Sequence, residues 1–334
     1  MKSDRTKTLK SLTDIKISIY NKSRKGGLEM KNINIANKLE VTEIGLGCMR
    51  MADLSKEEAG KVIRQALDSG ITFFDHADIY GGGKSEEIFA EAVEMNSDIR
   101  EKIIIQTKCG IVPGIMYDFS KEHILNSVDG SLKRLKTDYV DSLLLHRPDT
   151  LMEPEEIAEA FSKLYESGKV KNFGVSNATP MQIELLNKYL DNKIIINQMQ
   201  FGIMHTGMID SGLNTNMKCD AGIDRDGGIL EYCRLKDITI QAWSPYQYGF
   251  FEGVFLDNPK FPELNKKIDE ISEKKGVSNT SIATAWILRH PARIQTIIGT
   301  MNPNRIKDIC TASDVELTRQ EWYEIYLAAG NKLP

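Results

Sequence analysis

The chain has 334 residues, which is long enough for two ordinary domains or for one large barrel of alternating strands and helices. Hydrophobic residues make up 41% of the chain and charged residues 27%, an ordinary soluble composition that argues against a disordered, collagen-like or membrane-embedded protein. The 43 basic and 47 acidic side chains give a net charge of −4, without the basic excess typical of nucleic-acid binding. We therefore expect neither a nucleic-acid nor a membrane partner.

The five cysteines are scattered along the chain and form no Cys-x-x-Cys pair. This spacing argues against a disulfide framework and against a zinc ribbon, and a reducing compartment is the natural setting for such a chain. The sequence therefore predicts a cytoplasmic protein. The cysteines are Cys48, Cys109, Cys219, Cys233 and Cys310.

The first 29 residues differ from the rest of the chain, because they carry eight basic and only three acidic side chains. They lack the continuous apolar region and the cleavage site of a secretory signal, which leaves a transit peptide or a basic arm as alternatives. The run from Lys25 to Met30 can also be encoded by a ribosome-binding site placed just upstream of a start codon, so our hypothesis is that Met30 is the true start. We expect residues 1–29 to be a basic extension that packs poorly, and residues 30–334 to form one domain.

From residue 30 onward, short runs of β-branched residues alternate with longer amphipathic runs. Residues 31–35 and 39–41 are predicted to form a hairpin with Asn37 near its turn. Eight further runs are predicted strands, at residues 44–46, 71–74, 103–107, 139–145, 172–175, 194–198, 239–243 and 296–298.

Helical periodicity is clearest at residues 56–69, which begin after Ser55 as a predicted N-cap and end at Gly70. Similar patterns predict helices at residues 120–135, 156–166, 179–189, 228–235 and 304–311. Strands that alternate with helices imply a parallel sheet, because parallel neighbours need crossover connections.

Eight such units predict a closed (β/α)8 TIM barrel, with the short N-terminal β-hairpin before it and an extra C-terminal helix after it. The alternative is an open doubly wound sheet, which normally shows a Gly-x-Gly-x-x-Gly motif after its first strand. In this chain Arg50 stands in place of the third glycine, so we favour the barrel. Two longer insertions, residues 202–225 and 246–262, then fall at the carboxyl end of the barrel, where binding loops lie.

Polar residues interrupt the ends of three apolar strands. Asp75 ends the second predicted strand, and Tyr80 follows five residues later. Lys108 ends the third strand and His146 ends the fourth. In a barrel, these four side chains are expected at neighbouring positions around one mouth.

These four side chains are suited to donating a proton to a carbonyl oxygen. A tyrosine with an ordinary pKa of about 10 is a poor acid at neutral pH, and a neighbouring Lys108 ammonium is expected to lower that pKa. Asp75 would hold Lys108 charged and in place, and a neutral His146 would orient the substrate oxygen. None of these side chains supplies a hydride, so the reaction needs a nicotinamide cofactor.

Each of these residues also has a purely structural interpretation. Asp75 and Lys108 alone fit an ion pair at the barrel rim, Tyr80 fits a loop aromatic, and His146 fits a hydrogen-bonded core histidine. A metal site is a further alternative, because carboxylates and imidazoles bind divalent cations at barrel mouths. Lys108 would compete with a metal ion for the same pocket, so we expect no metal. The candidate ligands are Asp75, His76, Asp78 and His146.

Several separate motifs in a fixed order make the chain resemble an aldo/keto reductase of a bacterial branch of predicted oxidoreductases. They are Asp-His-Ala-Asp-Ile-Tyr-Gly at 75–81, Lys-Cys-Gly at 108–110, His-Arg-Pro-Asp at 146–149, Ser-Gly-Lys-Val at 167–170, Gly-Val-Ser-Asn at 174–177, Asn-Gln at 197–198, Trp-Ser-Pro at 243–245 and Ile-Gly-Thr at 298–300. The resemblance implies the (β/α)8 fold and a catalytic tetrad of Asp75, Tyr80, Lys108 and His146. It also implies that Tyr80 is the proton donor.

The resemblance further implies that NADPH is the cofactor. Its carboxamide would be held by Ser176, Asn177 and Gln198, and its nicotinamide ring would stack on Trp243. Contacts to the pyrophosphate would come from Ser244, Pro245 and Tyr246. The 2′-phosphate would be gripped by Thr300 and Arg305. As structural alternatives, Ser176 and Asn177 fit a helix cap, Trp243 fits the core, and Arg305 fits an ordinary surface position.

Two positions depart from the family pattern. Many members have a lysine where Gly299 stands and an asparagine where Ile309 stands. We therefore expect NADPH to be preferred, with NADH as an alternative.

Together these features predict an NAD(P)H-dependent enzyme that reduces a small aldehyde or ketone to an alcohol. The alternative is an NADP-binding sensor subunit that regulates a partner, as some family members do with channels, but the intact tetrad counts against it. The substrate pocket is expected to be formed by Met49 and by residues 111–119, 202–225 and 246–259. Their Met, Tyr and Phe content suggests an apolar or aromatic carbonyl compound. The oligomeric state is not predicted.

Overall fold

The computed structural model describes residues 30–333. The basic segment 1–29, its expected poor packing and the hypothesis about Met30 concern residues outside this range. Within it, no helix is both long and apolar enough to cross a membrane. All five cysteines lie in this range as free thiols, and four of them are buried.

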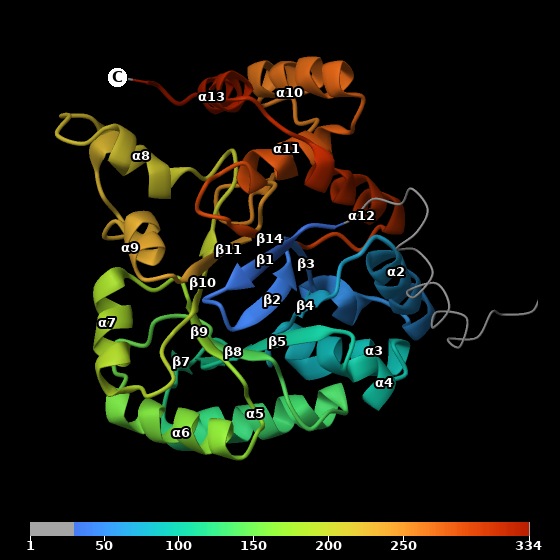
Figure 1. Cartoon of the computed structure of the whole chain (residues 1–334), viewed down its shortest axis with the longest axis vertical. Helices are drawn as coiled ribbons and strands as arrows, with labels where there is room; N and C mark the ends of the chain where they lie inside the picture. Colours follow the sequence, from blue (N-terminus) through green and yellow to red (C-terminus); the bar gives the residue numbers. More distant parts are fainter. Residues whose placement is uncertain (1–29, 334) are drawn as a thin grey trace, which may run out of the picture.

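Eight parallel strands close into a barrel at the centre of the molecule (Figure 1). Each strand pairs with the next along the chain, and the eighth pairs with the first through Thr296 opposite Ile44. This closure confirms the predicted (β/α)8 TIM barrel and rules out the open doubly wound sheet. The barrel strands are β3 (Ile44–Gly47), β4 (Phe73–Asp75), β5 (Ile104–Cys109), β8 (Ser142–Leu145), β9 (Phe173–Ser176), β10 (Ile196–Gln200), β11 (Thr239–Trp243) and β14 (Gln295–Ile298).

Every barrel strand is followed by at least one α-helix, and these helices surround the barrel (Figure 1). They are α2 (Lys56–Asp68), α3 (Lys84–Ala92), α4 (Ser97–Arg100), α5 (Lys121–Leu135), α6 (Pro154–Glu166), α7 (Pro180–Tyr189), α8 (Gly207–Leu213), α9 (Ile229–Leu235), α10 (Pro262–Lys275), α11 (Asn279–Leu288), α12 (Pro303–Cys310) and α13 (Arg319–Ala328). The predicted cap of α2 is confirmed, because the Ser55 side chain and Glu58 form a reciprocal capping box. The last helix, α13, is the expected extra C-terminal helix.

The second barrel strand begins two residues later than its sequence pattern predicts. The backbone N–H of Ile71 bonds to the carbonyl of Ala66 at 2.9 Å and so helps to end helix α2. That amide is not free to join the sheet, so β4 begins at Phe73. Its last residue is Asp75, which places this carboxylate at the carboxyl end of the barrel.

Helices α3, α4, α10 and α11 and parts of the two long insertions were not predicted. Residues 281–287 of α11 are all buried, so the helix has no polar face and no amphipathic period for a sequence pattern to reveal. The insertion at 202–225 contains α8, and the insertion at 246–262 contains a short hairpin of β12 (Gln247–Tyr248) and β13 (Gly253–Val254). These elements depend on packing against the barrel rather than on local periodicity.

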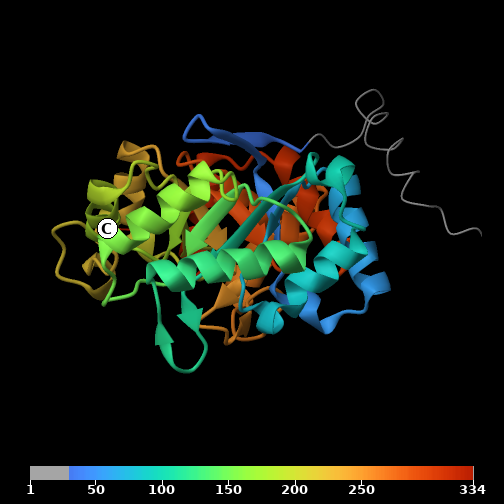
Figure 2. The ribbon, with the colours of Figure 1, turned by 90° about the horizontal axis from the view of Figure 1, so that it is seen from below.

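Two hairpins mark the two ends of the barrel (Figure 2). The predicted N-terminal hairpin, β1 (Asn32–Ile35) and β2 (Leu39–Thr42), covers the amino ends of the strands, where Ile35 and Val41 share an apolar cluster with Phe73. The hairpin of β6 (Ile111–Val112) and β7 (Met116–Tyr117) projects from the opposite end. The carboxyl ends of the strands therefore face the second end, away from the N-terminal hairpin.

Candidate functional site

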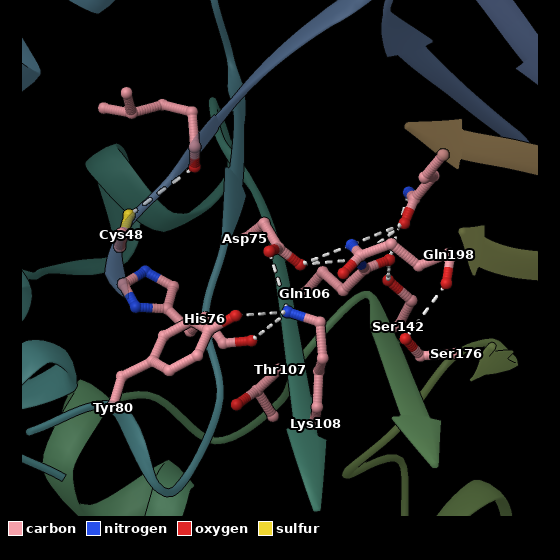
Figure 3. A network of polar contacts seen from close by, with 12 residues as sticks. Cys48, Asp75, His76, Tyr80, Gln106, Thr107, Lys108, Ser142, Ser176 and Gln198 are labelled. Carbon is pink, nitrogen blue, oxygen red and sulfur yellow. Dashed lines mark hydrogen bonds and ion pairs between the residues drawn. The ribbon is translucent and has the colours of Figure 1, made fainter. Parts of the chain in front are cut away.

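The four side chains predicted to carry the chemistry lie together at the carboxyl end of the barrel. Figure 3 shows three of them, Asp75, Tyr80 and Lys108. Asp75 ends β4, Lys108 lies in β5, and His146 directly follows β8. Tyr80 begins a short 3-10 helix, η3 (Tyr80–Gly83), after β4. Asp75, Tyr80 and His146 line a cavity of about 440 Å³, and Lys108 lies beneath it with no exposed surface.

The Lys108 ammonium is held by three oxygen atoms (Figure 3). Its Nζ lies 2.7 Å from Asp75 Oδ2, 2.8 Å from the carbonyl oxygen of His76 and 3.2 Å from the hydroxyl oxygen of Tyr80. An ammonium can only donate hydrogen bonds, so the Tyr80 oxygen is the acceptor in the third contact. The O–H of Tyr80 is therefore left to donate to another group.

Burial and charge act in opposite directions on the tyrosine and the lysine. Burial lowers the pKa of Lys108, but Asp75 and Tyr80 together raise it by more than burial lowers it. The pKa is therefore raised overall, and the ammonium stays charged. Burial raises the pKa of Tyr80, and the lowering by Lys108 is smaller. The expected lowering of the Tyr80 pKa by Lys108 is present, but in the protein without ligand burial outweighs it. Tyr80 is a neutral phenol that retains its proton.

His146 is a neutral imidazole, as expected. Burial lowers its pKa well below the ordinary value, and the nearby charges of Lys108 and Arg147 lower it further. Its ring lies edge-on to Tyr80, with 6.0 Å between the ring centroids. No hydrogen bond ties the His146 ring to the described residues, and its Nδ1 is buried without a partner, so His146 is not the hydrogen-bonded core histidine of the structural alternative.

A network of four glutamines supports the Asp75 carboxylate from inside the barrel. Figure 3 shows two of them, Gln106 and Gln198, beside Asp75. Asp75 Oδ1 accepts a hydrogen bond of 2.7 Å from Gln106 and one of 3.1 Å from Gln198. Gln241 bonds to Gln106 and Gln198 and also donates to Gln295 at 2.8 Å. Sequence reasoning missed Gln106, Gln241 and Gln295, although an amide inside an apolar barrel strand is a signal that could have found them.

We expect Gln106→Leu to lower turnover roughly tenfold, the equivalent of one hydrogen bond to a charged group. The reason is that Asp75 Oδ1 would keep only the longer bond from Gln198. The matched control is Gln295→Leu, because Gln295 is equally buried and belongs to the same network but does not touch Asp75. Both variants should be less stable to urea, and only Gln106→Leu should lose turnover. Equal loss of turnover in the two variants would show that the network acts only through stability.

All nine predicted cofactor-binding residues line the same cavity as the tetrad. They are Ser176, Asn177, Gln198, Trp243, Ser244, Pro245, Tyr246, Thr300 and Arg305. They come from the carboxyl ends of β9, β10, β11 and β14 and from the first turn of α12. The cavity therefore extends from the tetrad to the exposed guanidinium of Arg305.

The structural alternatives for Ser176, Asn177 and Trp243 do not fit, whereas the exposed Arg305 still fits an ordinary surface position. Helix α7 is capped by Thr179, which forms a reciprocal capping box with Gln182, so Ser176 and Asn177 are not its cap. Asn177 has a φ of 58° and accepts a 3.2 Å hydrogen bond from the indole of Trp243. Trp243 is partly exposed at the cavity wall and is not a core residue.

The residues proposed as alternative metal ligands are used differently. Asp75 binds Lys108, and the ring of His76 is buried edge-on to Phe89, with 4.6 Å between centroids. Burial, followed by the charge of Lys108, lowers the pKa of His76 to about 3. Among residues 30–333, no three His, Cys, Asp or Glu side chains are grouped closely enough to hold a metal ion.

Comparison with known proteins identifies the family, because the sequence model of the aldo/keto reductase family matches residues 43–328. The chain belongs to the aldo/keto reductase family. It is 35% identical to 6-dehydroglucose reductase of Agrobacterium fabrum over 91% of this chain and 99% of that protein. It is 36% identical to an uncharacterized oxidoreductase, YcsN, of Bacillus subtilis over 91% of this chain and 100% of that protein. This aldo/keto reductase is accordingly an NAD(P)H-dependent oxidoreductase.

A solved structure shares the barrel. The aldo-keto reductase from Klebsiella pneumoniae, determined in complex with NADPH, has a TM-score of 0.70 and 23% sequence identity. The similarity covers 89% of this chain and 94% of that chain. At 23% identity, this similarity shows that the two proteins share a fold.

Proposed function

We propose that this aldo/keto reductase uses NADPH to reduce an aldehyde or ketone to an alcohol, with Tyr80 as the proton donor. The observation that carries the proposal is the contact of 3.2 Å between Lys108 Nζ and the Tyr80 oxygen. This contact leaves the proton of a neutral phenol available at the wall of the cavity. A bound NADPH supplies the hydride, which no side chain can provide.

Each member of the tetrad then has a distinct task. Tyr80 gives its proton to the carbonyl oxygen, and the Lys108 ammonium stabilises the phenolate that remains. Asp75 keeps Lys108 charged and fixed in position. The neutral His146 donates a ring N–H to the same carbonyl oxygen and orients it.

The cavity wall has the groups that the nicotinamide end of NADPH requires. The Nε2 of Gln198 is bonded to Asp75 and Gln241, which leaves its Oε1 to accept from the carboxamide. Ser176 and Asn177 are the other proposed carboxamide partners, and Trp243 offers a ring face for stacking. Ser244, Pro245 and Tyr246 line the proposed path of the pyrophosphate.

Arg50 compensates for the lysine that is missing at position 299. Its Nη1 donates to the Gly299 carbonyl oxygen at 2.9 Å and lies 3.3 Å from the point where a side chain at 299 would begin. Arg50, Thr300 and Arg305 line the same cavity. We therefore propose that two guanidiniums hold the 2′-phosphate and favour NADPH over NADH.

We expect Arg50→Met to weaken NADPH binding about tenfold, because one charge-assisted hydrogen bond to the 2′-phosphate is lost. NADH lacks that phosphate, so its affinity should change much less. Titration of protein fluorescence with each cofactor measures both affinities, and Arg305→Met provides a parallel comparison. Equal weakening of NADPH and NADH would assign Arg50 to a part of the cofactor that both molecules share, contrary to the proposal.

The proposed function is tested with purified protein, NADPH and a panel of aldehydes, ketones and dicarbonyls. Because one relative is a 6-dehydroglucose reductase, 6-dehydroglucose belongs in the panel. We expect NADPH to be consumed in a ratio of one to one with the alcohol formed, with no effect of a chelator. NADPH binding without turnover across the panel would instead favour the sensor subunit, and loss of activity with a chelator would favour a metal enzyme.

A further inference from the structure

Arg147, the residue after His146, is a partly buried cation without an anionic partner. No ion pair or hydrogen bond joins its guanidinium to any of the described residues, and its one ring contact is with Trp243, 5.6 Å from the ring centroid. Burying a charge is costly unless the charge is paired, so side chains of this kind are normally neutralised by a neighbour. The missing partner points to a ligand.

The guanidinium lies between two cavities. It lines the cavity of the tetrad and also a second cavity of about 400 Å³, and the two cavities share Asn177 and Trp243 as walls. The 202–225 insertion, including His205, forms much of the second cavity, and Gln200 lines it as well. Arg147 therefore stands where a substrate with its carbonyl beside Tyr80 and His146 would enter this second chamber, whose walls are partly polar and partly apolar.

The acidic groups of this chamber already have hydrogen-bond donors. Asp210 accepts from the hydroxyls of Tyr326 at 2.7 Å and Thr206 at 2.9 Å. Asp226 accepts from the backbone N–H groups of residues 228 and 229 at 3.1 and 3.2 Å. By contrast, the second cation of the chamber, Arg225, donates only to backbone carbonyls at 3.3 and 3.4 Å. Among these four charged side chains, Arg147 is therefore the one without a hydrogen-bond or ion-pair partner in the described part of the chain.

We propose that Arg147 binds a carboxylate carried by the substrate, so that the preferred substrates are aldehydes or ketones with a carboxylate at the other end. The Arg147 guanidinium lies near the Trp243 ring without a hydrogen bond, so its planar fork is free to match a carboxylate. This inference rests on the proposed reductase function and narrows its substrate class. It adds a carboxylate to the expected apolar or aromatic carbonyl compound, because the chamber walls combine charged groups with apolar side chains such as Met208 and Phe250.

The test compares 4-oxobutanoate with butanal, two aldehydes of equal chain length that differ in the terminal carboxylate. For the unmodified protein we expect kcat/KM to be about ten- to a hundredfold higher for 4-oxobutanoate, the range of one or two charge-assisted hydrogen bonds. Arg147→Met should remove most of this preference, mainly through KM. Arg147→Lys should keep part of it. Arg64→Met, on the outer side of helix α2, is the matched control and should leave the ratio unchanged.

The outcomes separate this inference from the proposed function. Reduction of both aldehydes without preference, or a preference that survives Arg147→Met, would overturn the carboxylate assignment and leave the reductase intact. If kcat/KM were higher for 6-dehydroglucose than for 4-oxobutanoate, and this preference depended on Arg147, the carboxylate assignment would also be overturned. Arg147 would then bind sugar hydroxyls. Failure to reduce any carbonyl compound would overturn the reductase. In that case, binding of succinate to the protein with NADP still decides the carboxylate assignment, since Arg147→Met should weaken it at least about tenfold.

Discussion

Tyr80→Phe is expected to lower turnover by at least about 10²-fold, the lower limit of the usual contribution of a general acid. Phenylalanine keeps the ring beside His146 but has no proton to give to the carbonyl oxygen. The substitution also removes the hydroxyl that accepts from Lys108, which keeps its bonds to Asp75 and to the His76 carbonyl. NADPH affinity should change little, because the hydroxyl is not among the proposed cofactor contacts.

The measurement combines steady-state turnover with fluorescence titration of NADPH. Tyr232→Phe is a suitable control, because the Tyr232 hydroxyl also takes part in a hydrogen bond, with Glu184 at 2.9 Å, but lies on α9 outside the cavity. The control should retain turnover. Comparable turnover in Tyr80→Phe and the unmodified protein would show that another group provides the proton.

Lys108→Met is expected to lower turnover by a similar factor and also to destabilise the fold by about 3–5 kcal/mol. The ammonium has no exposed surface and lies 2.7 Å from the Asp75 carboxylate. Removing one partner of a buried pair leaves the other as an uncompensated charge, which costs more than the pair itself contributes. The loss of stability should appear as a lower urea midpoint with an unchanged slope.

A double variant distinguishes the two effects of Lys108. Adding Asp75→Asn to Lys108→Met removes the uncompensated carboxylate, so part of the lost stability should return while turnover stays low. The surrounding amides of Gln106 and Gln198, which donate to Asp75 Oδ1, can still donate to the carboxamide oxygen of the introduced side chain. If the double variant were less stable than Lys108→Met, the ion pair would not be the source of the destabilisation.

The sequence was sufficient to predict the barrel and the meeting of four distant residues. The reason is geometric, because parallel strands in a closed barrel bring their carboxyl ends to one face. A polar residue at the carboxyl end of an apolar strand is therefore expected at that face of the barrel. Asp75, Lys108 and His146 each satisfy this description. Tyr80 lies in the short loop after Asp75, so it was expected at the same face.

Features that depend on contacts between distant elements could not be predicted. Gln106 and Gln241 are 135 positions apart, and Arg50 and Gly299 are 249 apart, so only the strand register brings each pair together. The direction of the Tyr80 pKa also depends on burial, which outweighs the effect of Lys108 and is not visible in the sequence. The missing partner of Arg147 is likewise a property of the assembled cavity walls.

The most direct test of the proposed chemistry follows the hydride itself. The protein is incubated with an aldehyde and with NADPH carrying deuterium at the transferable position of the nicotinamide. The alcohol is then analysed by mass spectrometry. We predict one deuterium on the former carbonyl carbon of each alcohol molecule. An alcohol without deuterium, or bound NADPH that stays unoxidised while the aldehyde is unchanged, would contradict the account.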